Sequence, residues 1–192
     1  RLQMFVHAER LAEDPGTLQD GDLSIFLRLG SDYRNNYYEY EVPMKPTRWL
    51  PRTFNADNIW PEDNEFDIEL AKLQELKLQR NAMSREEGSG VTLATPFVRF
   101  DGNNRMTIVG TPTLSNIKVI MIGVRNPRRT IRTPNDDGMP KSAEVWVNEL
   151  RLYDFEDQGG WAANARINAT LADLGNLAVS GFISTPGFGS IE

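Results

Sequence analysis

Alternation of apolar and polar residues dominates most of the chain and predicts β-strands. Residues 2–8, 23–29 and 36–44 each alternate in this way. Successive side chains of a strand point to opposite faces, so each segment is expected to bury one of its faces. We expect the second and third segments to form an antiparallel pair, because a Gly-Ser-Asp turn joins them. Their apolar and aromatic positions that share a face are Leu23, Ile25, Leu27, Leu29, Tyr38, Tyr40, Val42 and Met44.

A change of period near residue 70 predicts one short helix. Residues 66–70 alternate as a strand does, whereas Leu70, Leu73 and Leu76 recur at a spacing of three. Residues with that spacing lie on one face of a helix. The sequence therefore predicts a short strand that leads into a helix ending near Asn81, followed by a polar loop.

Three later segments extend the β pattern. Residues 96–110 form two arms around Asp101-Gly102-Asn103-Asn104, residue types that accept a positive φ in tight turns. Residues 117–124 are apolar on both faces, which is typical of a strand covered on both sides. We therefore expect that strand in the middle of the fold. A long strand follows in residues 142–155.

Together these segments predict a mainly β protein. Six or more strands and one short helix favour an antiparallel β-sandwich, of the jelly-roll or galactose-binding-like type, over residues 1–157. A chain of 192 residues is long enough for such a domain and an additional part. No signal peptide precedes the first strand, and we expect both ends to be interior positions of a longer protein.

The last part of the chain, residues 158–192, has a different composition and a longer alternating pattern. From Gly159 onward only three residues are charged, namely Arg166, Asp173 and Glu192. All odd positions of residues 161–171 are apolar, and after a turn residues 177–185 alternate again. Tilted strands of roughly 9 to 11 residues span a bilayer, with apolar side chains toward lipid and polar ones toward a wet lumen. The pattern predicts one hairpin of a transmembrane β-barrel, although an exposed hairpin of a soluble sandwich has the same period.

The predicted hairpin also has an orientation in the membrane. Trp161 begins the first arm, and an amphipathic ring is favoured at a membrane interface. The short turn near Gly175 is expected to face the periplasm, because bacterial barrels have short periplasmic turns and long external loops. Residues 1–157 are then expected on the extracellular side of the outer membrane. The side chains expected to face lipid are Trp161, Ala163, Ala165, Ile167, Ala169, Leu171, Leu177, Val179 and Ile183.

Charge and composition argue against several classes of function. The formal net charge of -6 disfavours a nucleic-acid binder, whose affinity depends on clustered Lys and Arg. The absence of cysteine removes disulfides, thiolate metal sites and thiol nucleophiles. The single histidine, His7, alternates with apolar neighbours and is interpreted as a packed or surface strand residue. We expect no enzyme activity, no cofactor and no metal.

Two groups of residues are candidate binding surfaces. Basic residues between positions 125 and 141 suit an acidic partner surface, although a solvated hairpin loop has the same composition. Aromatic residues suit stacking on sugars, although aromatics of a sandwich usually belong to its core. The basic group is Arg125, Arg128, Arg129, Arg132 and Lys141. The aromatic group is Trp49, Trp60, Trp146, Tyr33 and Tyr37.

Several strings resemble a known family of bacterial secretion proteins. They are NYYEYEVPM, IWPEDNEFDIEL, LSNIKVIMIGVRNP, SAEVWVNELRLYDF and GGWAANARINATLADLGNLAVSGFISTPGFGSIE. These strings are similar to the SprA (Sov) family, the giant outer-membrane protein of the Bacteroidota type IX secretion system. The resemblance runs from about residue 33 to the end and is most specific in the last third of the chain.

The resemblance implies a segment of a protein-export translocon that gliding species also need for motility. Its partners would be other type IX secretion components, secreted cargo proteins and outer-membrane lipid, and the family brings no catalytic residues. The sandwich would cap or gate the pore or bind partners, and the hairpin would supply two wall strands. The alternative is a carbohydrate-binding jelly-roll module of a bacterial surface protein, and a hydrolase has the least support.

Overall fold

The chain divides into two compact units, Arg1–Tyr153 and Asp154–Glu192. The computed structural model describes residues 1–13, 17–47, 55–127, 138–154, 161–171 and 175–184. Strands make up most of the regular structure in these ranges, and their pairings are antiparallel. The predicted fold class, mainly β with antiparallel sheets, is confirmed. The predicted boundary at residues 157 and 158 lies outside the described residues.

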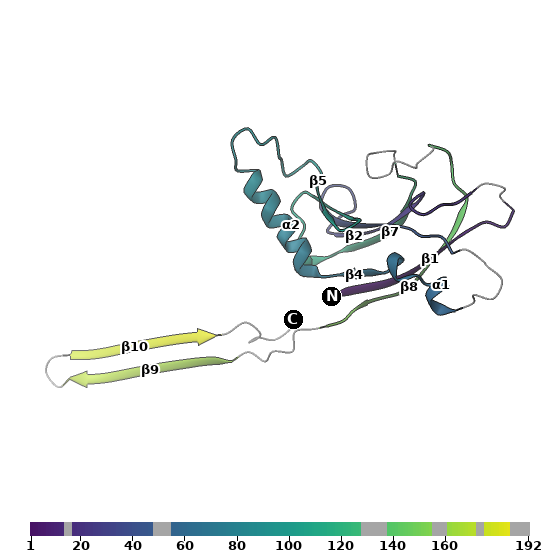
Figure 1. Ribbon diagram of the computed structural model, residues 1–192. Coiled ribbons are helices and arrows are strands. Elements are labelled where there is room, and N and C mark those ends of the chain that lie inside the picture. The colour runs from purple at the N-terminus through teal and green to yellow at the C-terminus, as the bar shows by residue number, and fades with distance from the viewer. Residues whose placement is uncertain (14–16, 48–54, 128–137, 155–160, 172–174, 185–192) are drawn as a thin grey trace. The chain divides into compact units, whose positions relative to one another are not determined.

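Two sheets build the first unit (Figure 1). In the described residues, one sheet has the strand order β4-β1-β8 and the other has the order β5-β6-β3-β2-β7. The first sheet consists of β1 (Leu2–Arg10), β4 (Phe66–Ile68) and β8 (Ala143–Leu152). The second consists of β2 (Ser24–Gly30), β3 (Tyr37–Pro43), β5 (Phe97–Asp101), β6 (Asn104–Val109) and β7 (Val119–Arg125).

One hydrophobic core joins the two sheets and a helix. Strand β1 contributes Leu2, Met4, Val6 and Ala8 to it. Strands β2 and β3 pair antiparallel, as predicted, and the positions predicted to share a face on these two segments are all buried. The period of two therefore identified the core face of both strands, since each inward position is followed by one that points away from the core.

The predicted strand and helix after residue 65 are confirmed. Helix α2 (Leu70–Met83) follows β4 and packs Leu73 and Leu76 into the core. A second helix, α1 (Ala56–Ile59), is not among the predicted elements, because a single turn is too short to show a helical period. The Asn55 side chain caps it by accepting a hydrogen bond of 3.0 Å from the backbone N–H of Asn58. Two 3₁₀ turns span Glu62–Asn64 and Leu114–Asn116.

The hairpin of β5 and β6 turns where the sequence predicted. Asp101 lies opposite Asn104, and Gly102 between them has a φ of +60°. Glycine adopts that left-handed conformation without the steric cost that a side chain brings. The turn places β6 between β5 and β3 in the five-stranded sheet.

The prediction that residues 117–124 form a central strand is wrong. Strand β7 lies at the edge of its sheet, and among the described residues it pairs with β2 alone. Its core-side residues Ile120, Ile122 and Val124 are 53, 37 and 47 % exposed. On the other face the Phe26 side chain lies over Gly123. Apolar residues on both faces therefore do not require that this chain covers both faces.

The second unit contains one hairpin in its described part. Strands β9 (Ala162–Leu171) and β10 (Gly175–Ser184) pair along their whole length, from Leu171 opposite Gly175 to Ala162 opposite Ser184. These two strands form a sheet of their own. The hairpin position and the two alternating arms agree with the pattern of the sequence.

Candidate functional site

The hairpin of β9 and β10 separates apolar from polar residues onto two faces. Residues directly opposite each other in an antiparallel pair share a face of the sheet. The register therefore places the predicted lipid-facing positions of both strands on one common face. In order along the hairpin, the opposed pairs on this face are Ala163 and Ile183, Ala165 and Gly181, Ile167 and Val179, Ala169 and Leu177, and Leu171 and Gly175.

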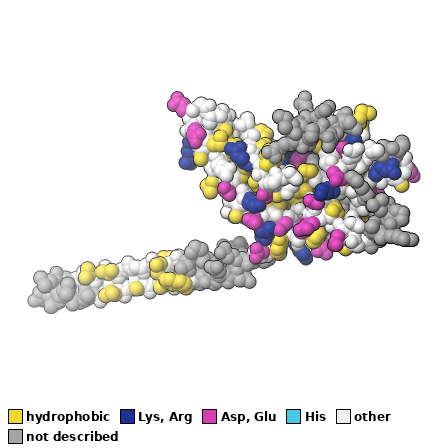
Figure 2. Space-filling model, in the orientation of Figure 1, with side chains coloured by type: hydrophobic (Ala, Val, Ile, Leu, Met, Phe, Trp, Pro, Cys, Tyr) yellow, Lys and Arg dark blue, Asp and Glu magenta, His cyan; other side chains and the backbone are white. Residues whose placement is uncertain are grey.

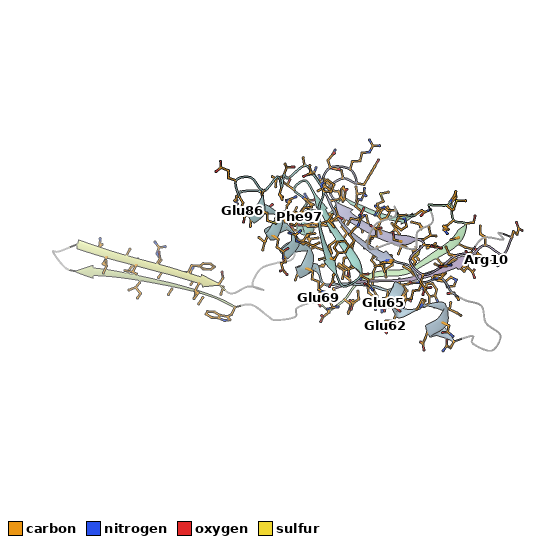
Figure 3. All side chains as sticks on the ribbon, turned by 45° about the horizontal axis from the view of Figure 1, so that its top comes forward. Arg10, Glu62, Glu65, Glu69, Glu86 and Phe97 are labelled. Carbon is orange, nitrogen blue, oxygen red and sulfur yellow. The ribbon has the colours of Figure 1, made fainter. Side chains whose placement is uncertain are left out.

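This apolar face is open in the structure. Ile167, Leu177, Val179 and Ile183 are between 53 and 65 % exposed, and Trp161 just before β9 is 55 % exposed. Figure 2 shows apolar side chains along the surface of the hairpin, and Figure 3 shows side chains standing off both of its faces. A sheet of two strands has no second layer in which to bury these groups.

The opposite face of the hairpin is mostly polar. Asn164, Arg166 and Asn168 come from β9, and Ser180 lies directly opposite Arg166 on β10. Asn164, Arg166, Ser180 and Phe182 line an open hollow on the hairpin. Phe182 departs from the pattern, because its position opposite Asn164 places a large apolar side chain on the polar face.

The two described members of the predicted basic group are paired within the chain. Arg125 ends β7 and binds the carboxylates of Glu39 and Glu41 through its guanidinium group. The Nζ of Lys141 lies 3.2 Å from Asp22 Oδ2, and both side chains are buried. Arg128, Arg129 and Arg132 lie outside the described residues. Arg125 and Lys141 therefore form ion pairs within the chain itself.

The pairing of Arg125 belongs to a buried ionic cluster that the sequence analysis missed. Glu39 and Glu41 lie on the face of β3 that points away from the core, yet both are buried. Glu39 accepts hydrogen bonds from the Nε and Nη2 of Arg28 at 3.0 and 2.5 Å. Glu41 pairs with Arg105 and with Arg125 and accepts a hydrogen bond of 2.5 Å from Ser24 Oγ. The arrangement neutralises both carboxylates by direct ion pairs.

The strand order explains why this cluster forms. Arg28 lies directly opposite Glu39 on the β2–β3 pair, and Arg105 lies opposite Glu41 on the β3–β6 pair. The guanidinium groups of Arg28 and Arg125 also stack over the Phe26 ring, at 5.4 and 4.5 Å from its centroid. The Glu-x-Glu pattern was visible in the sequence, but its partners follow only from the strand pairings.

The candidate aromatic group is not gathered on one sheet. Trp146 lies on β8, 56 % exposed, and its Nε1 donates to Glu144. Trp60 follows α1, whereas Tyr37 is buried on β3 and Tyr33 lies in the loop between β2 and β3. Trp49 lies outside the described residues. The described members therefore come from both sheets and from their loops.

The single histidine is a packed strand residue. His7 is buried on β1, and its Nδ1 lies 2.6 Å from the carbonyl oxygen of Ile59, to which it donates. Its ring lies 5.8 Å from the Trp60 ring, measured between centroids. These contacts attach the α1 segment to the face of β1 that points away from the core.

A second polar group links helix α2 to the β5–β6 hairpin. Asp101 accepts hydrogen bonds from Lys72 Nζ at 2.7 Å and from the Tyr40 hydroxyl at 3.0 Å. The Lys72 ammonium lowers the pKa of the Asp101 carboxyl, and burial raises the pKa of the Tyr40 hydroxyl to about 12. The three side chains therefore form a structural link between α2, β3 and the β5–β6 hairpin.

Within the described ranges, no three His, Asp or Glu side chains gather as a metal site would require. No helix in the described part of the chain combines the length and apolarity needed to cross a membrane.

Comparison with known proteins identifies the family. None of the curated proteins matched the chain. The family model described as "motility related/secretion protein" matches residues 1–192, which is the whole chain. This match covers both the sandwich and the hairpin, including the strings that carry the resemblance. The chain therefore belongs to the SprA N-terminal family of motility-related and secretion proteins.

Proposed function

We propose that this chain is a non-catalytic segment of an outer-membrane protein-export translocon of the type IX secretion and gliding-motility system. In this proposal β9 and β10 form two strands of the translocon wall. The first unit is a folded domain that caps or gates the passage or binds other secretion components and cargo. Membership of a motility and secretion family supports the coarse role, and the hairpin supports the position in a membrane.

One observation carries the proposal, namely the separation of the hairpin residues onto two unlike faces. The register aligns Ile167 with Val179 and Ala163 with Ile183 on one side, and Arg166 with Ser180 on the other. Each strand has 10 residues. That length matches the roughly 9 to 11 residues that a tilted strand needs to cross the hydrocarbon core.

The energetics favour an apolar environment on the first face. Removal of one Val, Leu or Ile side chain from water contributes roughly 1.5 to 3 kcal/mol. An isolated hairpin leaves four such side chains, Ile167, Leu177, Val179 and Ile183, more than half exposed. It is also marginal in water by itself. Hydrocarbon on one side and neighbouring wall strands at both edges would satisfy the apolar groups and the backbone together.

The position of the turn predicts how the hairpin is oriented across the membrane. A short connection, residues 172–174, joins the two strands. Short turns of bacterial barrels face the periplasm. The other end of the hairpin, where Trp161 precedes β9, then lies at the outer interface. We therefore place the first unit on the extracellular side.

Paired cysteine variants of neighbouring β9 residues test the membrane position. Ile167→Cys and Asn168→Cys differ by one position and point to opposite faces, and this chain contains no other cysteine. In the intact protein in outer-membrane vesicles, we expect a charged maleimide to label position 168 and not position 167. Detergent denaturation should make both positions reactive, which controls for thiol reactivity. Equal labelling of both positions in the vesicles would contradict the proposal.

A further cysteine tests the side on which the first unit lies. Leu78 is 69 % exposed on helix α2, so Leu78→Cys should leave the fold intact. A membrane-impermeant maleimide applied to intact cells is expected to label this position as fast as it does in broken cells. Labelling that appears only after the cells are broken would place the unit on the periplasmic side and leave the hairpin result unaffected.

A further inference from the structure

The β7 edge of the five-stranded sheet is unlike the β8 edge of the three-stranded sheet. In the described residues, β7 lies at one edge of the five-stranded sheet and β8 lies at one edge of the three-stranded sheet. Edge strands present unpaired backbone N–H and C=O groups along one side. Both strands also have apolar residues on the face that they share with the core, so each could continue the core if another strand were added.

Strand β7 carries three apolar side chains in register with the core. Ile120 lies opposite Leu29, Ile122 opposite Leu27, and Val124 opposite Ile25. The three β2 residues are buried, whereas their β7 partners are 53, 37 and 47 % exposed in the same order. Within the described residues, the core therefore reaches the edge of the sheet, where its last row is left partly exposed.

Strand β7 lacks the features that protect edges. Natural edge strands are blunted by charged residues, prolines or bulges. From Val119 to Val124 the strand has no charge and no proline, and its pairing with β2 continues without a register shift. Its one charged residue is Arg125 at the end, and that guanidinium is held by Glu39 and Glu41.

Strand β8 has these protective features. Its register with β1 shifts between Gln3 and Phe5, so that Glu149 and Leu150 face the single residue Met4. Glu149 has a φ of +54°, which costs a non-glycine residue free energy and marks a bulge. The strand also carries Glu144, Glu149 and Arg151. The β8 edge is therefore blunted against pairing and the β7 edge is not.

We propose that β7 is a docking edge to which an extended segment of another protein adds as a sixth strand. The backbone groups of β7 would pair with the segment, and Ile120, Ile122 and Val124 would contact apolar residues at alternate positions of it. This mode of recognition takes its affinity from main-chain hydrogen bonds and its register from alternate side chains. The fitting partner is therefore a strand with apolar residues at every second position and no charge among them.

The size of the edge favours a peptide segment over a second copy of the chain. Strand β7 has 7 residues. A contact confined to one such strand belongs to the smallest interfaces, below about 1,200 Å² in total, which are typical of weak and transient encounters. Two folded domains would need more area for a stable dimer, whereas an extended segment can bind and leave. This inference does not depend on the environment of the β9–β10 hairpin.

Photocrosslinking from single positions of the intact protein in its native membrane tests the inference. Benzoylphenylalanine is introduced at Ile120, Ile122 or Val124, with Val147 on β8 as the matched control. Val147 is 45 % exposed, close to the 47 % of Val124, and lies opposite the buried Val6. We expect crosslinks from the three β7 positions to residues spaced by two along one segment of a different polypeptide, and none from position 147.

Charge substitutions sharpen the same experiment. Ile122→Lys should reduce the crosslink from position 120 at least tenfold. The apolar residues of the partner segment would have to bury the introduced ammonium group, which is unfavourable without a polar partner. Leu78→Lys on helix α2 should leave that crosslink unchanged. The proposal would be overturned by the absence of a product, by a product within the same polypeptide, or by crosslinks that lack the spacing of two. Equal crosslinking from position 147, or a crosslink that survives Ile122→Lys, would also overturn it. Crosslinks between two copies of this chain would overturn the proposed peptide partner and indicate a dimer.

Discussion

The two units of the chain use the same period of two with opposite results. In the first unit, alternation sends side chains into a core where Met4, Ile25 and Phe66 are completely buried. In the hairpin, the same alternation leaves Ile167 and Leu177 more than half exposed. A strand pattern therefore shows that a strand has an apolar face, but it does not show what covers that face.

The second faces of the two units differ as well. In the first unit, the outward face of β3 carries Glu39 and Glu41, which are buried beneath arginines of the same sheet. In the hairpin, the corresponding face carries Asn164 and Asn168, which are neutral and open to solvent. The sandwich pairs the two buried carboxylates within its own sheet, whereas the hairpin has few charges to pair.

The largest expected contrast comes from removal of one phenylalanine in each unit. Phe66→Ala opens a cavity in the core and removes a ring contact with Tyr40, so we expect a loss of about 3 to 5 kcal/mol from the free energy of unfolding. Phe182→Ala, at a position 70 % exposed, should change the same quantity by less than about 0.5 kcal/mol. Pulse proteolysis of the intact protein in urea, with cleavage followed in the first unit, measures both. Similar losses would contradict the exposure of Phe182.

The next contrast places a charge on each face of the hairpin. Ile167→Lys should cost roughly 2 to 4 kcal/mol if that face meets the middle of a bilayer, and Asn168→Lys should cost much less because it would face water. Urea unfolding of the intact protein in lipid vesicles measures the difference. Equal effects of the two lysines in vesicles would remove the distinction between the faces and leave the hairpin as an exposed ribbon.

The sequence predicted most of the strands because burial and the period of two agree in them. Residues 23–29 and 36–44 were assigned to the correct face, and the β4–α2 junction was found from the change in spacing at Leu70. The prediction for β7 failed because the strand lies at an edge, where its core-side residues are left partly exposed, and on its other face the Phe26 ring of the neighbouring strand lies over Gly123. Strand order cannot be deduced from the pattern of one segment.

The candidate sites were predictable to different degrees. The hairpin face required only local alternation, and the register of β9 with β10 aligns the positions as expected. The basic group was defined by composition, and the structure shows that Arg125 and Lys141 are ion-paired inside the fold. Those partners, Glu41 and Asp22, come from strands and loops far away in the sequence. Only tertiary structure could reveal them.

A smaller effect is expected from the ionic cluster of the sandwich. Glu39→Gln keeps the shape of the side chain but removes the charge that Arg28 and Arg125 share. We expect a loss of about 1 to 3 kcal/mol of unfolding free energy, since Glu39 is buried but its arginine partners remain partly in solvent. Glu75→Gln on the exposed side of α2 is the control and should stay within about 0.5 kcal/mol. Urea unfolding at low and high salt should give nearly the same loss, because buried pairs are screened little. A loss that disappears in high salt would contradict the burial of the cluster.

The smallest effect concerns Asp32, which lies in the loop between β2 and β3 of the first unit. The Asp32 carboxylate accepts hydrogen bonds from the backbone N–H groups of Asn35 and Arg34 and from the Asn36 side chain. These bonds lower its pKa from 3.8 to about 2. Because the folded pKa lies below the unfolded one, the stabilisation is complete above about pH 4 and is lost as the pH falls toward 2. Asp32→Asn should therefore destabilise the first unit modestly at pH 6 and flatten its stability profile between pH 4 and 2, whereas Glu87→Gln in the exposed loop after α2 should leave that slope unchanged. An unchanged slope in Asp32→Asn would show that the loop does not hold the carboxylate in this way.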